Sequence, residues 1–160
     1  MSYALDEIAD RLEIQDRIAL YVHAFDEKDF DALDEVFAPD TTFDFTKLGG
    51  GTRDWPTMKA YFKNHHNLPH DFHIYANVLI RFAPDRTHAT TKSKVYNPQG
   101  VLDADGNVRL YSLVGTYHDQ WHKRPEGWRV TGRRWELAWI DGDYPFSEPP
   151  GANLPTATEL

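Results

Sequence analysis

The chain has 160 residues, of which 41% are hydrophobic and 26% are charged. This length suits a single domain, which typically buries about 70% of the surface that its unfolded chain exposes. The 25 acidic residues outnumber the 17 basic residues and give a formal net charge of −8. This charge argues against a nucleic-acid partner, because nucleic-acid-binding proteins need a concentrated basic surface. There is no cysteine, which excludes disulfides, thiolate metal sites and cysteine nucleophiles.

The first residues, MSYALDEIADRLEIQDR, are acidic and amphipathic. They lack the basic start and apolar run of a secretory signal. No stretch of the sequence approaches the ~20 apolar residues of a membrane span. We therefore expect a cytoplasmic protein with no membrane partner.

The first third of the chain predicts three helices. A long amphipathic helix is expected over residues 5–25, because apolar residues recur there at three- and four-residue steps: Leu5, Ile8, Leu12, Ile14, Ile18, Tyr21, Val22 and Phe25. Asp29 is a suitable N-cap for a shorter second helix, ending at 38–40, that places three residues on one face: Phe30, Leu33 and Phe37. After a short strand at 41–45 and a glycine loop at 49–51, Asp54 caps a third helix, with Pro56 in its first turn and with Met58, Tyr61 and Phe62 facing inward.

From His70 onward the hydrophobic period changes to two, which predicts strands at 72–82, 87–96, 108–122 and 128–140. The residues between 96 and 108 predict a longer connection that ends in a hairpin turn. On the first strand, one face is apolar (Phe72, Ile74, Ala76, Val78, Ile80 and Phe82) and the other is mixed (His73, Tyr75, Asn77, Leu79 and Arg81). Four prolines after Asp141 exclude a helix or a central strand. We therefore expect a domain over 1–140 and a Pro-rich tail over 141–160 that could pack on a neighbouring subunit.

Helices followed by an antiparallel meander indicate an α+β domain, with a curved sheet wrapped round the helices and enclosing a pocket. Alternation along the last two strands places these residues inside: Arg109, Tyr111, Leu113, Gly115 and Tyr117, then Thr131, Arg133, Trp135, Leu137 and Trp139. Arg134 takes the opposite face, although a one-residue slip would exchange it with Arg133. An aromatic cavity with a few polar groups is typical of sites for small molecules.

Asp26 and His73 are the most informative polar pair. Asp26 ends the first predicted helix and His73 opens the first long strand. An aspartate held against a histidine fixes the imidazole tautomer and stabilises its charged form, which makes the histidine a stronger and better-aimed base. Taken singly, Asp26 also fits a surface helix end, and His73 fits a hydrogen-bonded histidine at a strand entrance.

A cluster of His65, His66, His70 and His73 surrounds Asp71. Imidazole and carboxylate ligands suit zinc or non-haem iron. The spacing matches no standard motif such as HExxH, and it straddles a helix end, a loop and a strand start, so we predict neither a metal nor another cofactor. The segment DADGN (103–107) fits a hairpin turn better than a calcium loop, because position 12 of the loop would be a serine.

Three segments carry a resemblance to a known family: RIALYVHAFDEKDFDALDEVFAPD, FHIYANVLI and GTYHDQWHKRPEGWRVTGRR. They resemble the SnoaL-like branch of the nuclear transport factor 2-like superfamily, over residues 5–140. The resemblance implies a cone of cystatin-like topology, in which a bent, mixed or antiparallel sheet wraps around a long N-terminal helix and encloses the active site. Scytalone dehydratase, bile acid 7α-dehydratase and hexachlorocyclohexane dehydrochlorinase belong to this branch and use an Asp–His dyad.

Asp26 and His73 occupy the positions of that dyad. Tyr21 matches a tyrosine of the bile acid enzyme, and Arg133 matches an arginine that contacts the leaving group. The second histidine of scytalone dehydratase has no counterpart, and a lysine replaces the tyrosine in the dehydrochlorinase, so halide elimination is less well supported. The predicted catalytic residues are thus Asp26, His73, Tyr21 and Arg133, and the predicted pocket residues are Phe43, Phe45, Asn77, Leu113, Tyr117, Trp135 and Leu137.

The resemblance predicts a cofactor-independent lyase or isomerase, with dehydration favoured, acting on a small hydrophobic cyclic substrate. The alternative is a non-catalytic protein of the same fold, either a ligand-binding module or an assembly subunit such as the small subunit of a ring-hydroxylating dioxygenase. Family relatives form trimers, so a homo-oligomer is expected in either case, with a trimer favoured over a dimer.

Overall fold

The structure is a computed structural model that describes residues 3–66 and 68–146. Its elements, in chain order, are α1 (Leu5–Asp26), β1 (Phe37–Asp44), β2 (Thr52–Asp54), α2 (Trp55–His65), β3 (His70–Asp71), β4 (Ile74–Phe82), β5 (His88–Leu102), β6 (Val108–Arg124) and β7 (Gly127–Gly142). Short 3₁₀ turns lie at Ala32–Glu35 and Thr46–Leu48. This order confirms the predicted α+β class.

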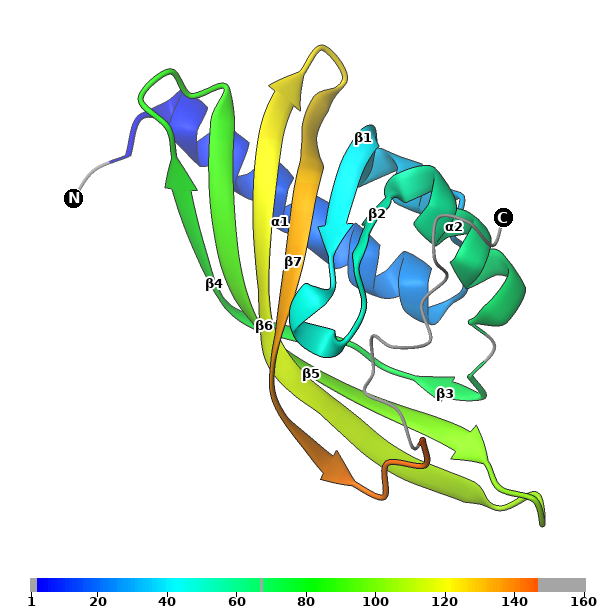
Figure 1. Cartoon of the computed structure of the whole chain (residues 1–160). Helices are drawn as coiled ribbons and strands as arrows, with labels where there is room; N and C mark the ends of the chain where they lie inside the picture. The colour runs from blue at the N-terminus through cyan, green and yellow to red at the C-terminus, as the bar shows by residue number, and fades with distance from the viewer. Residues whose placement is uncertain (1–2, 67, 147–160) are drawn as a thin grey trace.

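The described strands form one mixed sheet in the order β2-β1-β7-β6-β5-β3, and β4 also pairs with β5. β1 runs parallel to β7, and the other pairings are antiparallel. β5, β6 and β7 bend near their middle, so that the sheet curves around α1, while α2 lies beside β1 and β2 (Figure 1). The predicted cone-shaped sheet around a long N-terminal helix is therefore confirmed.

The long helix forms as predicted, but its buried face is shorter than predicted. Leu5, Ile8 and Leu12 are 86%, 39% and 55% exposed. The core face consists of Ile14, Ile18, Tyr21, Ala24 and Phe25. Positions 12 and 14 lie about 200° apart on an ideal helix, so the two apolar stripes cannot share a face. Only the second stripe packs against the sheet.

The predicted second helix is wrong. Residues 32–35 form only a 3₁₀ turn, and Phe37 opens strand β1. A helix this short is marginal on its own, and backbone pairing with β7 prevails, since the Val130 N–H donates to the Val36 carbonyl at 2.9 Å. The third helix begins as predicted, because the Asp54 carboxylate caps it by accepting from the Thr57 N–H at 2.9 Å.

A β-bulge in β4 corrects the predicted faces of this strand. Its pairing with β5 shifts register between Ala76 and Leu79, and Asn77 takes a φ of 52°. The extra residue reverses the alternation. Residues 72, 74 and 76, predicted on the apolar core face, are therefore exposed, whereas Tyr75 lies inside and is followed by inward-facing Val78, Ile80 and Phe82.

Strand β5 is longer than predicted, because it continues through Pro98 to Leu102. Proline removes a backbone donor and normally avoids central strands. Here the neighbouring strand is interrupted between β3 and β4, and the Pro98 carbonyl accepts from the Phe72 N–H at 3.1 Å. The longer strand turns Asn97 and Gln99 inward, where they are 4% and 7% exposed.

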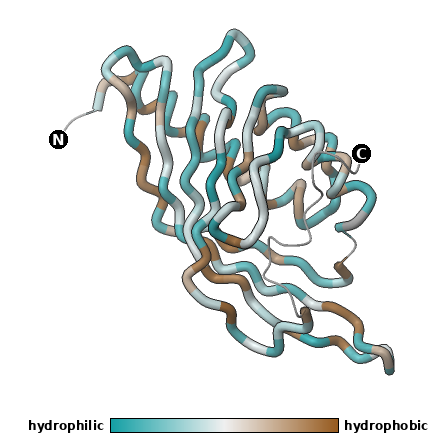
Figure 2. Tube along the Cα trace, in the orientation of Figure 1, coloured by the Kyte–Doolittle hydropathy of each residue, from teal (hydrophilic) through white to brown (hydrophobic). Residues whose placement is uncertain are grey.

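The core is rich in aromatic residues, and Trp121, Trp128 and Phe37 are almost completely buried. Hydrophobic and hydrophilic residues are mixed along the strands (Figure 2). None of the described helices has the length and apolar character needed to cross a membrane. β7 extends to Gly142, and residues 147–160 of the predicted tail lie outside the described residues. The division at residue 140 stays a prediction.

Gly115 gives a test of the sheet, since it lies where β6 meets β7 at a register shift. A Cβ there would overlap the Glu136 carbonyl oxygen and lie 2.8 Å from Trp135 Nε1. Because the backbone cannot easily yield, Gly115→Ala should lower the free energy of unfolding by about 1–3 kcal/mol. In the control Gly132→Ala the new Cβ meets the flexible end of Gln120 at 3.1 Å. Urea unfolding should show the smaller loss in the control, and equal losses would contradict the packing argument.

Candidate active site

The predicted contact between Asp26 and His73 is present. Asp26 Oδ1 lies 2.6 Å from His73 Nδ1, and Asp26 Oδ2 accepts a hydrogen bond from the His73 backbone N–H at 2.9 Å. The carboxylate therefore fixes both the ring and the main chain of the histidine. With a proton on Nδ1, the other ring nitrogen, Nε2, carries the lone pair that can accept a proton.

Asp26 occupies this position against local preferences. It is the last residue of α1, and a negative charge at a helix C-terminus typically costs about 0.3–1 kcal/mol. The turn that follows places Lys28 at a φ of 64°, a conformation that favours glycine. Backbone conformations and charge placements that cost free energy in this way are found preferentially at functional sites. The Lys28 ammonium group contacts Asp71 Oδ2 at 3.1 Å.

The sheet register explains how His73 reaches its second partner. Asp71 pairs with Gln99 and Tyr75 pairs with Val95. Both pairs have the same register, so His73, which is two residues from Asp71 and from Tyr75, lies opposite Asn97. His73 itself lies in the break between β3 and β4. Asn97 Nδ2 lies 3.0 Å from His73 Nε2. The imidazole is thus held at both nitrogens.

A second carboxylate, Asp71, lies beside the dyad, with a fully buried side chain. It contacts His66 Nε2 at 2.5 Å, and its Oδ1 lies 3.7 Å from His73 Nδ1. Burial opposes ionisation of Asp71, but the hydrogen bond from His66, the nearby His73 and Lys28 outweigh it and hold the pKa of the carboxyl below its usual value.

Two histidines of the predicted cluster contact these two carboxylates. His66 pairs with Asp71, His73 pairs with Asp26, and His70 is exposed. Ligand atoms of Asp26, Asp71 and His73 lie within 4.8 Å of one another. Asp26 already has both oxygens on His73, and Lys28 and His66 already contact Asp71. We assign no metal to this group.

Arg133 lies on the inner face of β7 and is 4% exposed. Its Nε and Nη2 donate to the two oxygens of Asp119 at 2.8 and 2.9 Å. The rings of Tyr21 and Tyr117 lie 4.3 and 4.4 Å from its guanidinium carbon. Burial opposes the charge, but Asp119 outweighs it and raises the pKa of Arg133 well above its usual value. Nη1 has no hydrogen-bond partner in the described part of the chain and remains available as a donor.

Tyr21 lies between the dyad and Arg133. Its ring centroid is 5.8 Å from that of His73. Burial and the neighbouring Tyr117 hold the pKa of the Tyr21 phenol well above its usual value, so the hydroxyl stays protonated and can donate. Tyr21 and Asp26 lie on different faces of an ideal helix, but both reach His73 because Asp26 lies at the end of α1.

His73, Tyr21 and Arg133 line one cavity of about 430 Å³, and Asp26 lies behind His73 outside its wall. Five of the seven predicted pocket residues line it: Phe43, Phe45, Leu113, Tyr117 and Trp135. Two were wrong. Asn77 is exposed because it lies in the β4 bulge. Leu137 keeps the register of Arg133 and Trp135, but it packs against the core outside the cavity wall.

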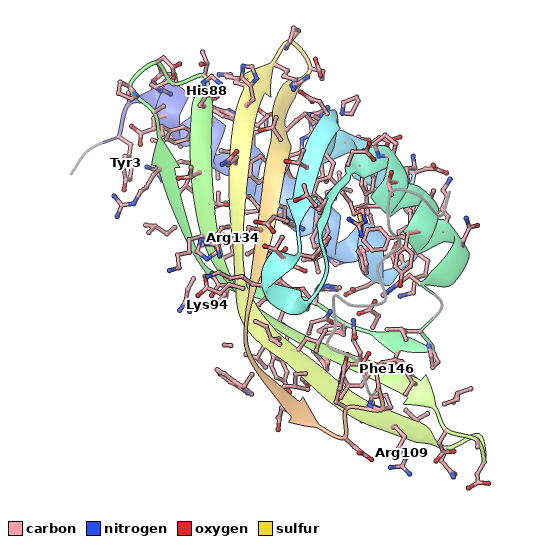
Figure 3. All side chains as sticks on the ribbon, in the orientation of Figure 1. Tyr3, His88, Lys94, Arg109, Arg134 and Phe146 are labelled. Atoms are coloured by element: carbon pink, nitrogen blue, oxygen red, sulfur yellow. The ribbon has the colours of Figure 1, made fainter. Side chains whose placement is uncertain are left out.

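Two further residues that alternation placed inside lie elsewhere. Arg109 lies towards the β5–β6 turn (Figure 3) and pairs there with Asp103 and Asp143. Trp139 is 59% exposed. Arg134 is half-buried and pairs with Glu136, so the predicted choice of Arg133 as the inward arginine was correct.

The sequence interpretation missed the polar wall formed by β5. Asn97 and Gln99 line the cavity, and the Tyr111 hydroxyl donates to Gln99 Oε1 at 2.6 Å. The signal was the alternation Val95, Asn97, Gln99, which continues the inward face of the strand. Pro98 and Gly100 obscured this alternation, because they are normally loop residues.

Comparisons with known proteins agree with this description. The family model described as the SnoaL-like domain matches residues 6–134. The uncharacterized protein Rv2910c of Mycobacterium tuberculosis is 35% identical over 129 residues, which covers 79% of this chain and 84% of the relative.

Two solved structures share the fold. A candidate scytalone dehydratase from Novosphingobium aromaticivorans has a TM-score of 0.76 at 16% identity and covers 90% of this chain and 94% of its own. The hexachlorocyclohexane dehydrochlorinase LinA of type 2 has a TM-score of 0.74 at 18% identity, with coverages of 92% and 98%. At these identities the matches show the fold alone.

The Arg133–Asp119 pair predicts a large effect on stability. Asp119→Leu should lower the free energy of unfolding by about 3–5 kcal/mol, because it leaves a buried guanidinium without its counterion. The exposed pair of Arg124 and Asp40 provides the control, and Asp40→Leu should change stability little. Chemical denaturation of both variants measures the difference. A loss no larger for Asp119 than for Asp40 would contradict the assigned ion pair.

Asp71 predicts a pH effect. Its pKa is lower in the folded protein than its ordinary value of 3.8. Its ionisation therefore stabilises the fold above that value, and this contribution is lost as the pH falls through the folded-state pKa. The stability difference between the wild type and Asp71→Asn should be largest near pH 6 and should narrow towards pH 3. Urea unfolding at several pH values tests this, and a difference that is constant with pH would count against it.

Proposed function

Because the chain belongs to the SnoaL-like domain family, we propose that it is a cofactor-independent lyase or isomerase, with dehydration as the favoured reaction. The observation that carries the proposal is the buried His73 imidazole in the wall of an aromatic cavity, held by Asp26 at Nδ1 and in contact with the Asn97 amide at Nε2. Solved enzymes of the same fold, named as a candidate dehydratase and a dehydrochlorinase, support an elimination reaction.

His73 is proposed as the general base. The Nδ1 proton on the Asp26 carboxylate leaves Nε2 to take a proton from a carbon atom of the substrate. Asp26 then stabilises the imidazolium that forms. A positioned base of this kind contributes about 10²–10⁴-fold to the rate.

Tyr21 and Arg133 are proposed to act on the leaving group. As the C–H bond breaks and the electron pair forms a C=C bond, the C–O bond breaks, and the departing hydroxyl takes the Tyr21 proton and leaves as water. The tyrosine regains its proton from solvent. Arg133 Nη1, which has no partner among the described residues, can donate to an oxygen on which negative charge develops.

The cavity favours a neutral, hydrophobic substrate. Its wall is mostly aromatic, and about 430 Å³ is enough for a small cyclic molecule. The charge of Arg133 is already balanced by Asp119 at hydrogen-bond distance. A substrate carboxylate would therefore gain little there, whereas a carbonyl or hydroxyl oxygen can accept from Nη1 without adding an unbalanced charge.

A non-catalytic assembly subunit is the weaker proposal. Such a subunit has no need of a cavity-wall histidine held by an aspartate, nor of a buried guanidinium donor that is unused in the described structure. A fold alone does not settle a function. The retained polar constellation favours the enzyme.

Self-association is part of the proposal. Apolar side chains are exposed on the outer face of the sheet, on four neighbouring strands: Ile74, Tyr96, Leu110 and Trp139. Exposed apolar surface of this kind often marks an interface. A homo-oligomer, with a trimer favoured, would cover it, and the proposed location is the cytoplasm.

Replacing the base tests the reaction. A panel of cyclic alcohols and hydroxy ketones is incubated with the protein, and loss of water is followed by mass spectrometry. His73→Gln should lower turnover by about 10²–10⁴-fold, because glutamine cannot accept the proton. The matched control is His70→Gln, which changes an exposed histidine on β3 outside the cavity wall. Full turnover by His73→Gln would refute the proposal, and a panel without any product would count against dehydration.

A further inference from the structure

Asn97 has two features that the proposed reaction does not yet use. Its side chain is buried on the inner face of β5, with Nδ2 3.0 Å from His73 Nε2, the nitrogen assigned to proton abstraction. Its carbonyl oxygen, Oδ1, is also buried and has no hydrogen-bond partner within residues 3–66 and 68–146. A buried amide oxygen without a partner is uncommon and calls for a reason.

The charge state of His73 decides what Nε2 can bind. A neutral imidazole with its proton on Nδ1 presents Nε2 as an acceptor, whereas an imidazolium presents Nε2–H as a donor. The titratable groups that face this ring are Asp26 and Asp71, both on the Nδ1 side, and Tyr21, whose ring lies edge-on to it. Within the described residues, Asn97 supplies the hydrogen bond at Nε2.

An amide is suited to both states, because it carries a donor and an acceptor on one planar group. A half-turn about the last side-chain bond of asparagine exchanges Nδ2 and Oδ1 without moving the backbone. The two orientations match the two protonation states of the imidazole. A carboxylate at this position would match only the imidazolium, and an apolar side chain would match neither.

We propose that Asn97 is a positioning residue that pairs with His73 Nε2 before and after proton transfer, donating from Nδ2 to the neutral ring and accepting at Oδ1 from the charged ring. Asn97 gains and loses no proton itself. It holds the ring aimed into the cavity, releases the single lone pair of Nε2 when the substrate C–H approaches, and accepts from the new N–H at Oδ1 once the substrate proton has arrived. The pairing is a property of the free protein, and only its kinetic consequence rests on the proposed function.

The pairing can be tested without any substrate. In protein labelled with ¹⁵N, the Asn97 side-chain amide signal should shift over the same pH range in which His73 Nε2 gains its proton. In Asn97→Asp, Nε2 should stay protonated to higher pH than in the wild type, because it then faces a carboxylate. The inference would be overturned by an Asn97 signal that does not change when His73 is protonated, or by an unchanged protonation curve of His73 in Asn97→Asp.

Turnover measurements test the positioning role. Asn97→Leu should lower kcat by about 10²-fold, the order expected when a reacting group is misplaced by about 1 Å, with a smaller change in KM. Asn97→Asp should be impaired at neutral pH and should recover partly as the pH rises. Wild-type kcat in Asn97→Leu would overturn the positioning role, whatever the NMR result.

The matched control is Ser93→Ala. Ser93 lies on the same strand and the same inward face, is fully buried, and has an unpartnered hydroxyl within the described structure, but it is not part of the cavity wall. Its variant should behave as the wild type in both experiments. Failure of the proposed function can be distinguished from failure of the Asn97 pairing. If His73→Gln kept full turnover while the wild type showed the expected amide shift, the pairing would stand and only its catalytic use would be refuted.

Discussion

The hydrogen bonds between Asp26 and His73 are the constraint on which the rest of the site depends. They join the last residue of α1 to the break between β3 and β4, so they fix where the helix ends relative to the sheet. This placement brings Tyr21 beside the imidazole and sets His73 opposite Asn97. A helix shifted by one residue would carry the carboxylate about 100° around its axis and break both bonds. The placement of these cavity residues therefore depends on one pair of hydrogen bonds between two elements.

Much of this site could be predicted from the sequence, and the failures have physical causes. The inward position of Arg133 followed from its alternation with Trp135, and the two residues keep one register against β6. Asn77 and Trp139 were misplaced because each lies in or just after a bulge, which changes the parity of the residues that follow, and no residue type predicts a bulge reliably. Asn97 was missed for the opposite reason. Pro98 signalled a loop, but the gap in the neighbouring strand removed the need for its backbone donor.

The charged groups in and beside the cavity are paired in the described structure. Arg133 has Asp119, Asp71 has His66 and Lys28, and Asp26 has His73. The cavity is therefore polar at a few points yet carries little unbalanced charge. Dipoles and donors fixed in this way need no reorganisation when a substrate arrives, which is the condition for effective electrostatic stabilisation.

The parallel pairing of β1 with β7 has a consequence for how the protein is made. It brings Phe43 beside Arg133, and Thr41 Oγ1 donates to the carbonyl of Val130, 89 residues further along the chain. Contacts so distant in sequence form late, because a long loop must close first. On the ribosome, helix α1 and the segment between β3 and β4 that holds His73 emerge well before β7. Both members of the Asp–His pair are therefore synthesised while the aromatic wall is still exposed to water. That apolar surface needs protection in the cell until β7 has been synthesised.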